Sequence, residues 1–204
     1  MIHALITVKP STRFPGKNAR LAGYSVGWLA WEILHEEEPV QAWTVGCRAE
    51  LPGFLPPGWR HIECATGSHR GDIEHAEAVI RPAAGDVLVL VQLTQPLRRR
   101  GLLHDVVARA RERGSAVTGC LGRQEDWRTV QPGGRWQSQK GQRVLLHDGA
   151  LYGWLPGKVE AIFSADAGHG VVINYTGQPV DVDEPGDIPC SLAGAWAEML
   201  LRDY

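Results

Sequence analysis

The feature that most constrains the fold is an unbroken apolar run, VLVLV, at residues 87–91. A strand with one face in water alternates polar and apolar residues, whereas this run is apolar at every position. Such a strand has to be covered on both faces. We therefore predict a central strand from Asp86 to Val91 in a mostly parallel sheet.

Strand-like and helix-like patterns alternate along the rest of the chain, which predicts an α/β protein. The predicted strands are Ile2–Val8, Val40–Cys47, Arg60–Cys64, Ala116–Leu121, one or two strands within Arg143–Trp154, Val171–Tyr175 and Pro179–Val182. The predicted helices are Gly23–Glu38, Gly71–Ile80, Leu102–Arg113, Gly157–Ser164 and Ile188–Tyr204. We expect a three-layer α/β/α sandwich forming one domain over residues 1–204, with a loop or hairpin excursion at 122–142.

Composition excludes several classes of partner. The formal net charge is −2, so no overall positive field favours nucleic acid or an anionic membrane. No apolar run approaches the length of a membrane span, and no secretory leader pattern opens the chain. The four cysteines are scattered without a Cys-x-x-Cys pair, as is typical of a reducing compartment. We expect a cytoplasmic protein whose anion-binding site, if it has one, is local.

The loop STRFPGKN at residues 11–18 follows the first predicted strand and precedes the first predicted helix. This is the position at which α/β proteins bind anions. Arg13 and Lys17 supply positive charge, Gly16 allows a close backbone approach, and Pro15 fixes one backbone angle. The alternative is an ordinary solvated Pro-Gly turn.

Two further segments carry polar groups. The segment QLTQPLR at 92–98 leaves the C-terminal end of the central strand, where open α/β sheets place their ligands. The alternative there is a plain turn into a basic helix. Asp181 and Asp183 are two residues apart on a predicted strand, so their carboxylates point to the same face and suit one Mg²⁺ ion. An exposed acidic turn, with Asp187 as a helix N-cap, is the alternative for this segment.

Four segments together resemble the cytidylyltransferases that activate acidic sugars, the acylneuraminate and 3-deoxy-manno-octulosonate enzymes. Ser-Thr-Arg-x-Pro-Gly-Lys resembles the octulosonate branch and Pro-Gly-Lys-Asn the acylneuraminate branch. Residues 89–98 are similar to Leu-Gln-Pro-Thr-Ser-Pro-Leu-Arg. Residues 148–152 (DGALY) resemble Asn-Gly-Ala-Ile-Tyr, with a looser echo of Arg-Arg-Gln at 135–137, and 180–188 resemble the Asp-Ile-Asp-x-x-x-Asp run. Because Asp-Gly also favours a tight turn, a plain hairpin at 148–149 is a rival interpretation.

The resemblance implies a Rossmann-like (GT-A-like) nucleotidyltransferase of nucleotide-sugar biosynthesis, which transfers CMP from CTP to an acidic sugar. It assigns catalysis to Arg13, Lys17 and Asp183, and Mg²⁺ to Asp181 and Asp183. Nucleotide contacts would come from Lys9, Ser11, Arg13, Lys17, Asn18 and Arg70. The acceptor sugar would be contacted by Gln92, Arg98, Arg135 and Tyr152, with ordering of the loop as the alternative role of Arg98. Family members also form homodimers through a segment near 122–142.

The chain departs from the family at two places. Thr7-Val8 stands where the family carries Ala-Arg before the first motif, so Lys9 is expected to reach the triphosphate instead. The segment 66–76, which in the family contacts cytosine and ribose, is short here, with Arg70 and Asp72 as candidates. Two other functions therefore stay open. One is a nucleotidyltransferase with another nucleotide or a non-sugar acidic acceptor, and the other is a non-catalytic nucleotide or sugar sensor.

Overall fold

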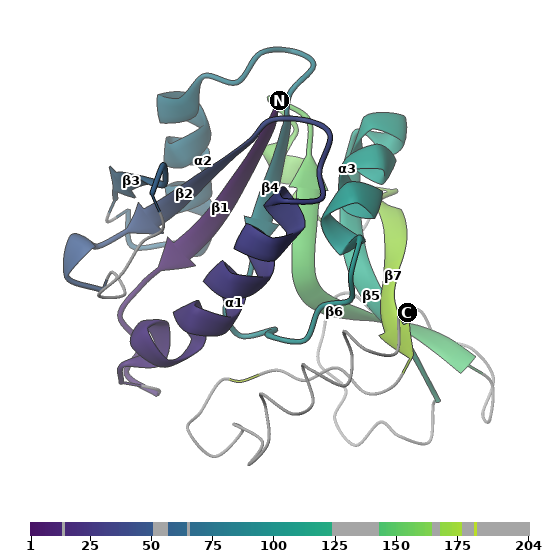
Figure 1. The fold of residues 1–204 in the computed structure, drawn as a ribbon, viewed down its shortest axis with the longest axis horizontal. Helices are drawn as coiled ribbons and strands as arrows, with labels where there is room; N and C mark the ends of the chain where they lie inside the picture. Colours follow the sequence, from purple (N-terminus) through teal and green to yellow (C-terminus); the bar gives the residue numbers. More distant parts are fainter. Residues whose placement is uncertain are drawn as a thin grey trace.

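The computed structural model describes residues 1–13, 15–50, 57–64, 66–123, 143–164, 168–176 and 182. Within these ranges one sheet of seven strands forms the centre of the molecule (Figure 1). The strand order is β3-β2-β1-β4-β6-β5-β7. The bounds are β1 Ile2–Val8, β2 Val40–Gly46, β3 Arg60–Glu63, β4 Val87–Val91, β5 Ser115–Arg123, β6 Arg143–Trp154 and β7 Gly170–Thr176.

The sheet is mostly parallel, as the apolar run at 87–91 predicts. β1 pairs in parallel with both β2 and β4, β2 with β3, and β5 with β7. β6 is antiparallel to its two neighbours, β4 and β5. Every residue of β4 is buried, which fits a strand covered on both faces.

Helices cover both faces of the sheet, which confirms the three-layer arrangement. α1 (Lys17–Ile33) and α3 (Leu102–Arg113) pack on one face, and α2 (His69–Ile80) and α4 (Val159–Phe163) pack on the other. A short 3-10 turn, η1 (Arg48–Glu50), follows β2. Successive side chains of a strand point to opposite faces of the sheet. In β1, Ala4 belongs to the core under α1 and α3, and Leu5 belongs to the core under α2 and α4.

One predicted helix has different boundaries, and the rival interpretation of a hairpin at 148–149 is wrong. α1 begins at Lys17 rather than Gly23 and ends at Ile33 rather than Glu38. Its start follows from Gly16, which takes a left-handed conformation at the N-cap, and its end precedes the acidic run 36–38, which a helix C-terminus disfavours. No hairpin forms at 148–149. Both residues lie inside β6, where Val117 of β5 pairs with Tyr152 and Gly119 pairs with His147, so residues 148–151 form an irregularity opposite Thr118.

Several expectations fall outside the described residues. They are the excursion at 124–142 with its dimer-forming segment, the strand at 179–181 and the helix at 188–204. Among the helices that the structure does describe, none has the length and apolar character needed to cross a membrane. Cys64 and Cys120 are buried free thiols, and Cys47 is a half-buried one.

The connections of β1 create a switch point in the sheet. From β1 the chain passes through α1 to β2 on one side, and after β3 and α2 it returns to β4 on the other side of β1. The connection that leaves β1 therefore leads to one side of the sheet, and the connection that leaves β4 leads through α3 to β5 on the other side. Open α/β sheets form ligand crevices at such points.

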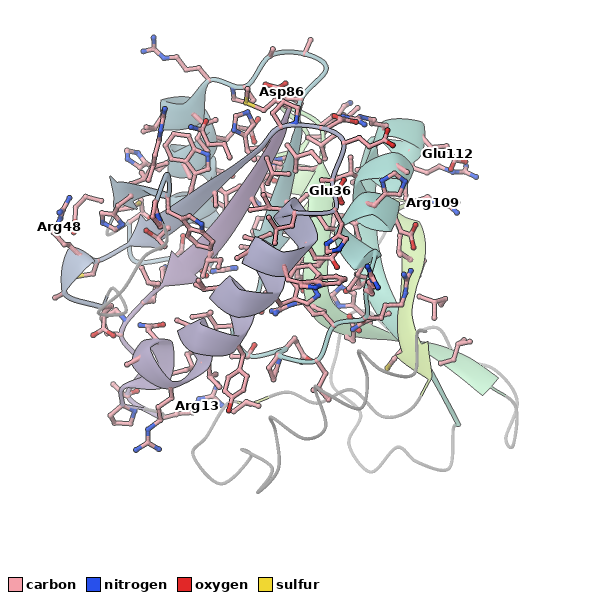
Figure 2. All side chains as sticks on the ribbon, viewed as in Figure 1. Arg13, Glu36, Arg48, Asp86, Arg109 and Glu112 are labelled. Atoms are coloured by element: carbon pink, nitrogen blue, oxygen red, sulfur yellow. The ribbon has the colours of Figure 1, made fainter. Side chains whose placement is uncertain are left out.

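A buried carboxyl joins α1 to α3. Glu32 on α1 is 2% exposed and accepts a hydrogen bond of 3.1 Å from the backbone N–H of Gly101, just before α3. Burial raises the pKa of Glu32 to about 7, against the lowering effect of the Gly101 bond. Figure 2 labels Glu36, which lies three residues beyond the end of α1 and beside α3, and burial raises the pKa of that carboxyl too.

Replacing Glu32 with glutamine is expected to stabilise the fold at pH 8 and to leave it nearly unchanged at pH 5. The folded pKa of Glu32 lies above the ordinary value of 4.5, so its contribution to stability is lost as pH rises through about 7. This shift corresponds to about 3 kcal/mol, and glutamine keeps an acceptor for Gly101 without the charge. Urea unfolding at both pH values measures the difference. Glu37→Gln, at an exposed neighbour, is the control, and an equal gain at both pH values would contradict the assignment.

Candidate functional site

A cleft of about 280 Å³ lies at the switch point between β1 and β4. It is lined by residues from the end of β1, the start of α1, the start of α2 and the segment after β4, namely Thr7, Lys9, Lys17, Asn18, His69, Gln92, Leu93 and Thr94. Four of the residues singled out in the sequence therefore share one cleft. They are Lys9, Lys17 and Asn18, predicted to bind the nucleotide, and Gln92, predicted to face the acceptor.

Lys17 enters the cleft from the first turn of α1. Gly16 has φ of +74°, a conformation in which L side chains are strained, and the helix begins at the next residue. The N-terminus of a helix carries partial positive charge, which adds to that of Lys17. No acidic partner of Lys17 occurs in the described part of the chain. This corner of the cleft is thus suited to an anion.

Arg13 and Ser11 are placed differently. Arg13 is exposed beside the first turn of α1 (Figure 2), and neither residue lines the cleft. Both have contacts of their own. Their predicted nucleotide contacts remain predictions.

Asn18 fixes the loop that precedes α1. It is 2% exposed, and its Nδ2 donates to the backbone oxygen of Lys9 at 2.9 Å and to Glu50 Oε2 at 2.8 Å. Asn18 thereby ties the end of β1 to η1. Its own position in the cleft is set by these two bonds.

Lys9 is held by a buried carboxylate beneath the cleft. Its Nζ lies 2.5 Å from Asp72 Oδ2, and Asp72 is 0% exposed. The other carboxylate oxygen accepts from Thr66 Oγ1 at 2.7 Å, Thr66 N at 3.0 Å and Cys64 Sγ at 3.1 Å. Burial alone would raise the pKa of Asp72, but Lys9, Thr66 and Cys64 together lower it to about 2. Asp72 is therefore an ionised internal anchor, and the candidate contact from Asp72 to a ligand is not supported.

His69 is a cleft residue that sequence reasoning missed. It opens α2 directly after Ser68, whose side chain caps the helix by accepting from Gly71 N at 2.9 Å. Its ring packs edge to face on Phe163 at 6.2 Å between centroids. Burial and then the charge of Lys9 lower its pKa, which favours a neutral imidazole. Its Nε2 has no hydrogen-bond partner among the residues described. The Ser68 cap was the available signal, because it marks the first residue of the helix.

Arg98 is placed to order the loop after β4, which is the alternative of its two predicted roles. The side chain is fully buried, donates to the Gln92 backbone oxygen and to Ser25 Oγ at 3.3 Å, and stacks over Trp28 at 5.2 Å. Burial lowers its pKa to about 9. The buried guanidinium therefore fixes the backbone at Gln92 through its hydrogen bond to the Gln92 carbonyl oxygen.

Two other candidates lie away from the cleft lining. Arg70 points along the outside of α2, where its Nε lies 2.7 Å from Glu74 Oε1 and its guanidinium also pairs with Glu160. Tyr152 lies opposite Leu90 in the β4–β6 register, and its ring is 5.1 Å from that of His147. Their proposed contacts to nucleotide and acceptor remain predictions.

Arg135, Asp181 and Asp183 lie outside the described residues. Val182, the residue between the two aspartates, is described: it is buried, and its N–H donates to the backbone oxygen of Thr94 at 2.8 Å. Thr94 lines the cleft that also contains Lys17. Within the described ranges no group of three His, Cys, Asp or Glu side chains forms a metal site.

No family model matches this sequence, and no curated protein is significantly similar to it. Solved structures do match its fold. The CMP:2-keto-3-deoxy-manno-octonic acid synthetase complexed with CTP superposes with a TM-score of 0.64 at 14% identity, over 97% of this chain and 99% of that one.

Two further matches span nearly the whole chain. The 2-C-methyl-D-erythritol 4-phosphate cytidylyltransferase of Thermus thermophilus gives a TM-score of 0.51 at 15% identity, over 98% of this chain and 99% of that one. HddC from Yersinia pseudotuberculosis gives 0.56 at 10% identity, over 95% and 99%. At such identities the likeness is one of fold, and it confirms the predicted Rossmann-like three-layer architecture.

Proposed function

We propose that the protein is a cytidylyltransferase that transfers CMP from CTP to an acidic sugar and releases pyrophosphate. One observation carries the proposal: the switch-point cleft joins Lys17, at a helix N-terminus, to the Thr94 carbonyl, which binds the backbone of Val182 between two aspartates. This bond holds the residue between the two aspartates beside the cationic corner, which supports a site for a metal-bound triphosphate there. The ligand of the first matched structure, CTP, agrees with this arrangement.

The reaction would be an in-line displacement at phosphorus. The sugar hydroxyl forms a new bond to the α-phosphorus of CTP, the bond to the bridging oxygen breaks, and the leaving group departs as pyrophosphate with loss of the hydroxyl proton to solvent. Lys17 and the first turn of α1 would hold the departing phosphates. Gln92, fixed through its backbone by Arg98, would orient the acceptor. Positioning and charge stabilisation are most of what such a transfer needs.

A Mg²⁺ ion would be held by Asp181 and Asp183. The donor set fits this ion, since two carboxylates flank a residue that is hydrogen bonded at the cleft rim. When bound, the ion would neutralise phosphate charge and favour ionisation of the attacking hydroxyl.

A second candidate changes the acceptor and keeps the nucleotide. One of the matched structures is a 2-C-methyl-D-erythritol 4-phosphate cytidylyltransferase, a protein of the same fold whose name gives a phosphorylated polyol as its acceptor. A phosphorylated acceptor is therefore the runner-up.

Thermal unfolding with each of the four nucleoside triphosphates and Mg²⁺ tests the nucleotide. CTP at about 100 times its Kd is expected to stabilise the protein by about 3 kcal/mol and to raise the Tm by several degrees. Pyrophosphate release with sialic acid, 3-deoxy-octulosonate and 2-C-methyl-D-erythritol 4-phosphate then identifies the acceptor. Stabilisation by a triphosphate other than CTP would replace the cytidylyl assignment. Stabilisation by CTP without release from any acceptor would favour a sensor.

A further inference from the structure

We propose that Asp72 is a positioning residue that holds the Lys9 ammonium at the edge of the cleft, so that Lys9 meets the nucleotide phosphates in one fixed geometry. This inference rests on the proposed function and deepens it, because it names how the chain grips phosphate without the family's arginine. The departure at Thr7-Val8 would then be compensated by Lys9, held in place by Asp72 of α2.

The Asp72 carboxylate is fully committed to protein partners. It is completely buried, Oδ2 faces Lys9 Nζ at 2.5 Å, and Oδ1 accepts three donors from Thr66 and Cys64. These partners come from the end of β1 and from the segment after β3, while Asp72 itself lies on α2. Because donors from separate parts of the chain hold this carboxylate, it cannot move toward a bound ligand, and its position is fixed.

Lys9, in turn, is held at both ends. Its backbone oxygen accepts from Asn18 Nδ2 at 2.9 Å, and its Nζ is bound to Asp72. Its side chain is still 32% exposed and lines the cleft. An ammonium has three donors, so the bond to Asp72 leaves others for a phosphate oxygen. A lysine is usually a flexible point charge, and this one loses much of that freedom before the ligand arrives.

Charge distinguishes a positioning role for Asp72 from a purely structural one. Asp72 compensates Lys9 in the empty cleft, which leaves Lys17 as the lining cation without an acidic partner in the described ranges. In Asp72→Asn the full charge of Lys9 would remain beside the phosphates, but the neutral side chain would no longer hold the ammonium in one position. Binding of a small anion and turnover should therefore respond in opposite directions, which loss of structure alone would not produce.

The experiment compares Asp72→Asn, Lys9→Arg and Lys9→Met with the unmodified protein. Isothermal titration calorimetry with inorganic pyrophosphate is the binding readout, repeated at two salt concentrations, and CTP is titrated separately. Asp72→Asn is expected to bind pyrophosphate about fivefold more tightly and with a steeper salt dependence, while kcat for transfer falls about 30-fold. Lys9→Met is expected to lose about tenfold in pyrophosphate affinity. The double variant Asp72→Asn/Lys9→Met should bind pyrophosphate at least as tightly as Lys9→Met.

Lys9→Arg serves where Asp72→Asn folds poorly, because it keeps the buried carboxylate paired. Lys9→Arg should retain pyrophosphate affinity and have a lower kcat, because Asp72 cannot hold a planar guanidinium in the geometry in which it holds the ammonium. Glu74→Gln is the matched control, removing the same charge from the exposed side of α2. Pyrophosphate affinity and kcat that fall together in Asp72→Asn, or that both stay unchanged, overturn the positioning role. If the unmodified protein binds neither CTP nor pyrophosphate, the proposed function itself is wrong.

Discussion

Replacing Lys17 with alanine is expected to lower kcat/KM for nucleotidyl transfer by about 1000-fold while leaving the fold intact. Lys17 lines the cleft from the first turn of α1, where its charge adds to that of the helix N-terminus. Lys9, the other lysine in the cleft, is already paired with Asp72. Lys17 therefore supplies most of the uncompensated positive charge available to the departing pyrophosphate within the described cleft.

The measurement is steady-state pyrophosphate release, with urea unfolding to show that stability is kept. Because charge develops on the leaving group in the transition state, we expect the loss mainly in kcat. Lys17→Arg should recover part of the activity. Arg20→Ala is the matched control, since Arg20 is an exposed cation in the first turn of α1 and does not line the cleft. Equal losses in Lys17→Ala and Arg20→Ala would point to general electrostatics and against a specific contact.

Most of the fold can be predicted from periodicity. β1 and α3 have the predicted bounds, and the predicted central strand is β4, shortened by one residue at Asp86. These elements have strong apolar patterns that packing then satisfies, with Leu102, Leu103, Val106 and Ala110 of α3 buried. The apolar pattern of each element is contained in its own sequence, so it can be recognised without knowing the rest of the structure.

The misses arise where tertiary contacts override a local signal. Asp148-Gly149 has the composition of a tight turn, yet it forms an irregular stretch inside one continuous strand, β6, with φ of +68° at Gly149. Asp148 is buried there and accepts from Thr118 Oγ1 at 2.5 Å, Ala150 N at 3.0 Å and Asn174 Nδ2 at 2.8 Å. Three converging donors suit a carboxylate, which also gives a physical reason for aspartate where the family has asparagine. No short-range pattern contains this information.

The site was predictable in outline and not in detail. The positions of Lys17 and Gln92 follow from the rule that ligands bind where strands β1 and β4 end. The pairing of Lys9 with Asp72 and the entry of His69 depend on how α2 packs on the sheet, and the sequence between β3 and α2 does not encode that angle. Arg98 illustrates the same limit, since only its burial beneath Gln92 distinguishes ordering of the loop from contact with substrate.

Replacing Asp183 with asparagine is expected to reduce turnover by about 1000-fold, through loss of a carboxylate ligand to Mg²⁺. The structural reason is the bond of 2.8 Å from Val182 N to the Thr94 oxygen, which ties the residue before Asp183 to the rim of the cleft that contains Lys17. An asparagine keeps the size and polarity of the side chain but removes the charge that binds the ion. Asp181→Asn should show a similar loss, because two carboxylates would share one ion.

Metal dependence separates this prediction from a loss of structure. In Asp183→Asn the Mg²⁺ concentration needed for half-maximal turnover should rise at least about tenfold, and CTP binding measured without Mg²⁺ should be unchanged. Asp187→Asn is the matched control, because it removes a carboxylate from the same segment at a predicted helix N-cap, where asparagine serves as well as aspartate, and it should leave the metal requirement unchanged. Undiminished turnover in Asp183→Asn would remove the metal assignment, and the cationic corner around Lys17 would then have to bind its anion without a divalent ion on the opposite side.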